Sequence, residues 1–208
     1  MNIFNEIEEN IIKLLAKEDS IAKERKELLI SLADYISQKK KEKKEVSLIF
    51  ICTHNSRRST MSQIWAMTAA KYFGIEDIKC YSGGTEATAF NPRAVKAVEA
   101  SGFEVIKFEK SDNPVYLVSY SDEAKPIKCF SKVYNHSSSP KEDFAAIMTC
   151  SDADKNCPIV IGADARFPIR FDDPKEFDGT EFEEIKYKER FEQIGIEMLF
   201  VFKNVKIL

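Results

Sequence analysis

The fold is decided by the stretch Val46-Ser47-Leu48-Ile49-Phe50-Ile51, which is followed directly by Cys52-Thr53-His54-Asn55-Ser56-Arg57-Arg58-Ser59. The first part is a nearly continuous apolar run, which is typical of a strand buried on both faces of a sheet. The second part is a polar loop, and after it apolar residues recur at helical spacing between Met61 and Tyr72. A buried strand, a polar loop and a helix in this order predict the first unit of a parallel α/β sheet.

The alternation of strand and helix continues beyond this unit. Residues 78–81 are predicted as a second short strand, which ends in Ser82-Gly83-Gly84. The next helix has Asn91 as a cap, Pro92 in its first turn and Gly102 at its stop. Strands and helices in alternation favour parallel strands joined by crossover helices.

Residues 103–135 depart from this pattern. Two strands, over 115–120 and 127–134, are predicted to form a hairpin, so we expect an antiparallel element attached to the sheet. Residues 144–148 have the pattern of a buried strand, and residues 169–171 are predicted as a last short one. The expected fold class is an open parallel sheet with helices on both faces, carrying an insertion at about residues 110–142.

The N-terminal part of the chain predicts only helix. Apolar residues recur at helical spacing in two stripes within residues 1–44, and the second helix ends in a run of lysines at 39–44 that we interpret as a solvated helix end. We therefore divide the chain into an N-terminal helical segment, residues 1–45, and a domain over residues 46–208. The helical segment has three possible uses: a homodimer contact, a cover for the site, or a surface for a partner.

Composition limits the function classes. The chain has 208 residues and a formal net charge of −3, which argues against a general nucleic-acid binder. The N-terminus lacks the basic region of a signal peptide, and no apolar run is long enough to span a membrane, so we expect a cytoplasmic protein. Thiols are kept reduced in that compartment, so we expect the five cysteines to do chemistry or to fill the core.

The polar loop has the composition of an oxyanion site. Cys52 and Arg58 are separated by five residues and lie between a buried strand and a helix N-terminus, where backbone N–H groups and the helix dipole favour an anion. Arg58 is able to pair with two oxygens of the anion. The same field favours a thiolate at Cys52, which makes it a candidate nucleophile. Ser56 and Ser59 are candidate hydrogen-bond donors, and Asn55 tolerates the left-handed backbone that a cradle loop needs.

A second cysteine pair, Cys150 and Cys157, follows the buried strand at 144–148. Zinc is disfavoured because the spacing matches no common pattern and only His54 and His136 are available as histidine ligands. Two unreactive thiols are one interpretation of this segment. The other is a resolving pair for a redox cycle, in which a polar, mobile segment lets each sulfur reach the next.

Residues 46–109 and 143–208 resemble the low-molecular-weight protein tyrosine phosphatase superfamily, and most of all its thioredoxin-coupled arsenate reductase branch. By this resemblance Cys52 matches the nucleophile, Arg58 the oxyanion-binding arginine, and Asn55 and Ser59 the loop-shaping positions. The segment from Cys150 to Cys157 resembles the arsenate reductase branch. The chain departs from the family at two loop positions, with His54 where Gly is usual and Arg57 where Cys is frequent.

The resemblance also implies a general acid, because the family has an Asp before a Pro in this part of the chain. Asp173, before Pro174, matches it. Asp172 is expected to help hold a proton on the carboxylate pair, since like charges oppose double ionisation. A solvated turn is the alternative interpretation of Asp172-Asp173-Pro174.

Three functions follow from these residues. The first is arsenate reduction, as the resemblance implies: Cys52 attacks arsenate, Cys150 and Cys157 relay the disulfide, thioredoxin reduces it, and no metal or organic cofactor is required. The second is a phosphatase acting on a phosphate ester such as phosphotyrosine through a phosphocysteine. The third is a non-catalytic module that binds an oxyanion or a phosphoprotein.

Overall fold

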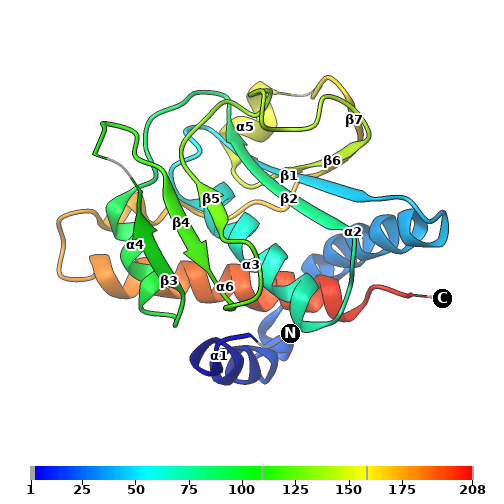
Figure 1. Cartoon of the computed structure of the whole chain (residues 1–208), viewed down its shortest axis with the longest axis horizontal. Coiled ribbons are helices and arrows are strands. Elements are labelled where there is room, and N and C mark those ends of the chain that lie inside the picture. The colour runs from blue at the N-terminus through cyan, green and yellow to red at the C-terminus, as the bar shows by residue number, and fades with distance from the viewer. Residues whose placement is uncertain (1–2, 109, 158, 208) are drawn as a thin grey trace.

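A parallel sheet lies at the centre of the structure, a computed structural model that describes residues 3–108, 110–157 and 159–207 (Figure 1). Its four strands are, in spatial order, β2 (Ile78–Gly84), β1 (Val46–Cys52), β6 (Phe144–Met148) and β7 (Ala163–Phe167). All neighbouring pairs are parallel, which confirms the predicted sheet. The prediction of a strand at 169–171 was wrong. The edge strand lies earlier, at 163–167, where Asp164 and Arg166 are tolerated because an edge strand is only half covered.

Helices cover both faces of the sheet, but unequally. The helical elements are α1 (Asn5–Leu15), η1 (Glu18–Ser20), α2 (Lys23–Lys41), α3 (Arg58–Tyr72), α4 (Pro92–Glu99), α5 (Ser151–Asn156), η2 (Pro174–Phe177) and α6 (Glu183–Lys203). Alternate residues of β1 separate the two cores: Leu48 and Phe50 pack toward the long helices, while Ile49 and Ile51 pack toward α5. Figure 1 shows α5 on the opposite side of the sheet from α6.

The N-terminal helices pack on α6 within the same chain. The apolar faces of α1 and α2 are buried in the larger core; they comprise Ile7, Ile11, Leu14, Leu29, Leu32, Ala33 and Ile36. Helix α6 approaches closely at Gly195, where a Cβ atom would lie 2.7 Å from Trp65 Cε2 and 2.9 Å from Leu14 Cδ1. Within the described residues no helix is long and apolar enough to cross a membrane.

The insertion forms a sheet of its own. The predicted hairpin is present as β4 (Tyr116–Ser119) and β5 (Ile127–Cys129), and β3 (Glu104–Lys107) pairs antiparallel with β4. The predicted antiparallel element is confirmed. Its strands form a sheet separate from the parallel one, and the insertion joins the parallel sheet through a bridge between Val133 and Gly84 at the end of β2. The second hairpin strand is shorter than 127–134 because residues 130–134 leave β4 and run beside the end of β2. Gly84 N–H donates to Lys132 O at 2.8 Å, and Tyr134 N–H donates to Gly84 O at 2.9 Å. We call residues 130–134 the strap.

Helix α4 confirms the predicted cap at its start, the proline in its first turn and the glycine at its end. The Asn91 side chain accepts a hydrogen bond from Arg93 N–H, and Pro92 occupies the first turn. Gly102 follows the helix with φ of +92°, a left-handed conformation that favours glycine. This helix lies next to the loop after β1, because Asn91 N–H donates to Ser56 O at 2.9 Å.

Candidate active site

The polar loop connects the carboxyl end of β1 to the N-terminus of α3, as predicted. Asn55 has φ of +47°, which confirms the expected left-handed backbone. Its buried side-chain Nδ2 donates to Ser59 Oγ at 2.8 Å and to Thr60 Oγ1 at 3.2 Å. Among the described residues, the backbone N–H groups of residues 54–57 donate to no protein acceptor. Unpaired N–H groups beside a helix N-terminus form an anion-binding cradle.

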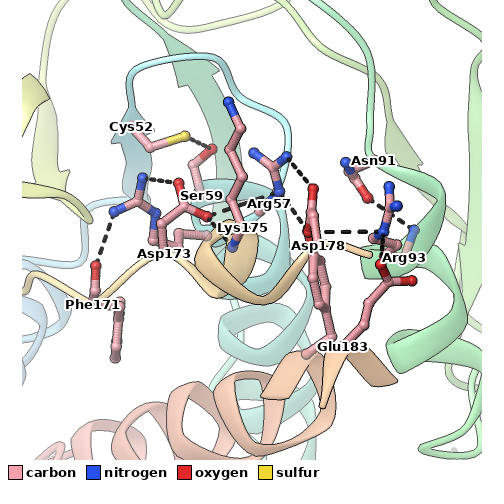
Figure 2. Close-up of polar contacts among 12 residues, drawn as sticks. Cys52, Arg57, Ser59, Asn91, Arg93, Phe171, Asp173, Lys175, Asp178 and Glu183 are labelled. Atoms are coloured by element: carbon pink, nitrogen blue, oxygen red, sulfur yellow. Dashed lines mark hydrogen bonds and ion pairs between the residues drawn. The ribbon is translucent and has the colours of Figure 1, made fainter. Parts of the chain in front are cut away.

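Cys52 lies at the base of this loop and is only 3% exposed. Its Sγ is 3.1 Å from Ser59 Oγ, which confirms the expected contact between a loop serine and the sulfur (Figure 2). Ser56 contributes to the loop through its backbone carbonyl, which accepts from Asn91 N–H. The Cys52 thiol is therefore shielded from solvent and held by a hydroxyl that is itself bonded to Asn55.

Arg58 and Asp173 are brought together although 115 positions separate them in the sequence. Arg58 Nη2 donates to Asp173 Oδ2 at 2.5 Å, and Nη1 donates to Phe171 O at 3.0 Å. The buried Nε of Arg58 has no hydrogen-bond partner among the described residues. The structure thus brings the predicted anion-binding arginine and the predicted general acid together at the loop.

Asp172 does not take part in the Arg58–Asp173 ion pair. Its side chain is 93% exposed and lies 3.5 Å from Arg190, while Asp173 accepts from Lys175 N–H at 3.1 Å. The expected sharing of a proton between the two carboxyls was wrong, because successive side chains of this extended segment point in different directions.

Arg57 and His54, the two departures from the family pattern, make polar contacts with residues outside the loop. Arg57 Nε donates to the Tyr187 hydroxyl at 2.8 Å, and its Nη2 is 3.7 Å from Asp178 (Figure 2). Burial and a hydrogen bond to Asp178 raise the pKa of Tyr187 to about 12. His54 Nε2 lies 3.6 Å from Glu86 at the mouth of the loop. The sequence carries no local signal for this role of Tyr187, because its partners Arg57 and Asp178 lie outside α6.

The mouth of the loop opens into a cavity of about 310 Å³. It is lined by His54, Ser56, Arg57, Thr88, Ala89, Asn91, Pro92 and Lys175. The lining is basic and holds no carboxylate among the described lining residues, so this cavity beside the loop is suited to an anion.

The second cysteine pair flanks α5. Cys150 is buried and caps the helix, and its Sγ is 3.5 Å from the hydroxyl of Thr53, the residue after Cys52. Cys157 follows the helix and is partly exposed. Both thiols belong to the same apolar cluster as Cys52. The predicted mobile segment is instead a short helix, stabilised by Asp154, which pairs with Arg170 at 2.6 Å and with Arg166.

The two remaining cysteines are Cys80 and Cys129, and both lie in the larger core. Burial raises the pKa of the Cys129 thiol to about 12 and that of Cys80 further. These thiols stay protonated at neutral pH, so Cys80 and Cys129 are the cysteines that fill the core. Among the described residues no three His, Cys, Asp or Glu side chains are placed to hold a metal ion.

The strap is the part of the site that the sequence did not predict. Ser131 Oγ donates to His54 O at 2.7 Å and accepts from Thr88 N–H at 2.7 Å, and Lys132 N–H donates to Asn55 Oδ1 at 3.0 Å. Gly83 makes room for the strap, because a Cβ there would lie 2.3 Å from Tyr134 Cα. Gly84 makes room for the anion loop, because a Cβ there would lie 2.6 Å from Thr53 O. The insertion therefore braces the anion loop at His54 and Asn55. A serine and a lysine in an insertion carry no sequence signal for such a role.

Comparisons with known proteins agree with this geometry. The family model described as low molecular weight phosphotyrosine protein phosphatase matches residues 47–112. The chain is 31% identical over 149 residues to the arsenate reductase of Bacillus subtilis (strain 168), covering 71% of this chain and 88% of that protein. It is 29% identical over 140 residues to arsenate reductase 2 of Staphylococcus epidermidis, covering 67% and 87%.

A solved structure of similar fold is that of a low molecular weight phosphotyrosine phosphatase from Vibrio cholerae O395. The TM-score is 0.52 at 12% sequence identity, and the match covers 74% of this chain and 93% of that chain. At this level of identity the likeness establishes the fold. It confirms the expected phosphatase-like α/β sheet.

Proposed function

This chain belongs to the low-molecular-weight phosphotyrosine protein phosphatase superfamily, and from that premise we propose that it is an arsenate reductase with Cys52 as its nucleophile. The observation that carries the proposal is the grouping of Cys52, Cys150 and Cys157 in one apolar cluster beside the anion loop. The similarity to curated arsenate reductases supports it, since it covers most of the length of those proteins.

The first step uses the loop. Arsenate is held by the unpaired N–H groups of residues 54–57 and by Arg58, whose buried Nε is left as a free donor among the described residues. The Cys52 thiolate attacks the arsenic and forms a sulfur–arsenic bond. The departing hydroxide receives a proton from Asp173 and leaves as water.

The second step transfers electrons through the thiols. Cys150 attacks the sulfur of Cys52; a disulfide forms, the sulfur–arsenic bond breaks, and its electron pair reduces As(V) to As(III). Cys157 then attacks Cys150, which frees the Cys52 thiolate and leaves a Cys150–Cys157 disulfide. An external dithiol reduces this bond, and thioredoxin in the cytoplasm is the partner we propose for that step.

The Cys150–Cys157 disulfide requires α5 to unwind. The two cysteines are seven positions apart across the helix, so a rise of about 1.5 Å per residue separates their Cα atoms by about 10 Å. A disulfide allows at most about 7 Å. We therefore expect faster amide hydrogen exchange over residues 151–156 in the oxidised protein than in the reduced protein.

Thioredoxin-coupled oxidation of NADPH in the presence of arsenate tests the proposal. We expect turnover by the native protein and its loss in both Cys150→Ser and Cys157→Ser. Cys129→Ala is the matched control, because that thiol is buried away from the relay, and it should retain turnover. Turnover that persists in either relay variant would overturn the mechanism.

A phosphatase is the second candidate, and one observation favours it. The matched family model ends at residue 112, so it covers the anion loop but neither Cys150 nor Cys157. Hydrolysis of an ester through a phosphocysteine needs only Cys52, Arg58 and Asp173. Aryl phosphate hydrolysis without arsenate turnover, unaffected by Cys150→Ser, would establish this function instead. If neither assay detects activity, the remaining candidate is the non-catalytic module that binds an oxyanion or a phosphoprotein.

We propose that the N-terminal helices belong to the same folded unit as the catalytic loop. Their apolar faces are buried against α6, so a homodimer formed through them would have to use their exposed polar faces. Analytical ultracentrifugation decides between a monomer and this dimer.

A further inference from the structure

A second cavity, of about 460 Å³, lies between α3, β2 and the insertion, outside the catalytic loop. Its volume lies within the range of small-molecule sites. Met67, Ile78, Ile127 and Phe130 supply apolar surface to it. The cavity is adjacent to the open side of β2, which is an edge strand of the parallel sheet.

The charged groups of this cavity all have one sign. Four lysines line it, at positions 79, 125, 128 and 132, and no acidic side chain is among the described lining residues. Lys79 pairs with Glu45 at 2.7 Å, whereas Lys125 and Lys128 are exposed to solvent. The surface is therefore complementary to an anion although the whole chain is acidic.

Lys132 is the unusual member of this set, because it is only 5% exposed and has no carboxylate partner among the described residues. Its ammonium lies 3.4 Å from Phe130 O and 4.5 Å from the centre of the Phe130 ring. Burial lowers the pKa of Lys132 to about 8. A buried cation without a counter-ion costs stability, and an anion that pairs with Lys132 would recover part of that cost.

Gln63 has a buried polar atom that lacks a hydrogen-bond partner among the described residues. Its Nε2 donates to Cys80 O at 3.0 Å, but its buried Oε1 has no partner among the described residues. The side chain is 6% exposed and lines the cavity. A buried acceptor of this kind requires a donor.

We propose that this cavity binds a small organic anion with an apolar body, whose charged group pairs with Lys132 and whose N–H or O–H group donates to Gln63. The site is separate from the oxyanion loop and does not depend on the reaction proposed for it. It is linked to that loop by one residue: the Lys132 side chain lines the cavity, and its backbone N–H holds Asn55. Binding is therefore expected to stabilise the loop.

The probe for this site is 8-anilinonaphthalene-1-sulfonate, which combines an aromatic body, an anionic group and an N–H donor. Fluorescence titration of the reduced full-length protein should give one saturable site. The uncharged N-phenyl-1-naphthylamine should bind at least tenfold more weakly to the native protein, a comparison that needs no variant. Equal binding of the two probes, or no saturable binding, would overturn the proposal.

Variants separate a ligand site from a structural lysine. Lys132→Met should weaken sulfonate binding at least tenfold while raising the melting temperature of the free protein, because it removes an uncompensated buried charge. Lys132→Arg should retain binding, and Lys107→Met, on an exposed residue of β3, is the matched control. A lower melting temperature with unchanged binding in Lys132→Met would show that the residue is structural.

Hydrogen exchange tests the link to the loop. With the sulfonate bound, exchange should slow over residues 53–59 in the native protein and not in Lys132→Met. Protection confined to residues 125–132 would refute the link.

Discussion

Ser131 braces the anion loop from the insertion, and its removal is the most direct test of that role. The hydroxyl is buried and serves two backbone groups, the carbonyl of His54 and the N–H of Thr88, each at 2.7 Å. Ser131→Ala removes both hydrogen bonds, and a typical hydrogen bond contributes about 0.5–1.5 kcal/mol net. Thr88 is exposed and His54 is half-buried, so water replaces part of what is lost, and the carbonyl of His54 keeps a weaker contact with Thr88 Oγ1 at 3.4 Å. We therefore expect a loss of about 1–3 kcal/mol in the free energy of unfolding, from the same magnitudes.

Urea unfolding of the native protein and of Ser131→Ala measures this loss. Ser31→Ala is the matched control, because that hydroxyl bonds only to Leu28 O within its own exposed helix, and it should change the free energy of unfolding by less than about 0.5 kcal/mol. Under conditions where Ser131→Ala is folded, kcat/KM should still fall by roughly tenfold or more, since catalysis is sensitive to the placement of the loop. A variant as stable and as active as the native protein would refute the bracing role.

Three further perturbations have equally definite outcomes. Asp173→Asn should lower kcat by roughly 10²–10⁴-fold in steady-state assays, as expected for loss of a general acid, while Asp172→Asn, on the exposed neighbour, should leave kcat unchanged. Ile11→Ala should cost about 2–5 kcal/mol in urea unfolding because the side chain is fully buried, whereas Ile12→Ala, on a residue 59% exposed, serves as its control; equal effects would show that α1 is not packed on the core. Tyr187 has a pKa raised from 10.0 to about 12 in the folded protein, so the stability it contributes is complete below pH 10 and is lost as the pH rises toward 12. Thermal melts across this range should show a smaller decline for Tyr187→Phe than for the native protein, and parallel declines would contradict the assignment.

The parts of the fold that were predictable are those with local signals. An apolar run buried on both faces defines β1, and a cap, a proline and a glycine define α4 and its end. The loop was predictable for the same reason, because the left-handed Asn55 and the contact of Ser59 with Cys52 are set within eight consecutive residues.

The parts that were missed depend on distant residues. Helix α5 is too short to be stable by propensity, and it is held by Asp154, which pairs with Arg166 and Arg170 from beyond the helix. Strand β7 is half polar because it lies at an edge, so its sequence resembles a loop as much as a strand. The strap contacts the anion loop 77 positions away, and no periodicity within 130–134 signals that contact.

The contacts of Arg57 give it a different role from the one that its position in the loop suggests. A second cation next to Arg58 predicts stronger attraction of an anion to Cys52. The guanidinium of Arg57 is instead compensated by Asp178 at 3.7 Å and Asp173 at 3.8 Å, and it donates to Tyr187. Opposite charges this close cancel most of the field at longer range. Arg57 therefore fixes the end of the loop against α6. Arg58 is also paired, with Asp173 at 2.5 Å, but its buried Nε has no partner among the described residues and is the donor that we propose for the oxyanion.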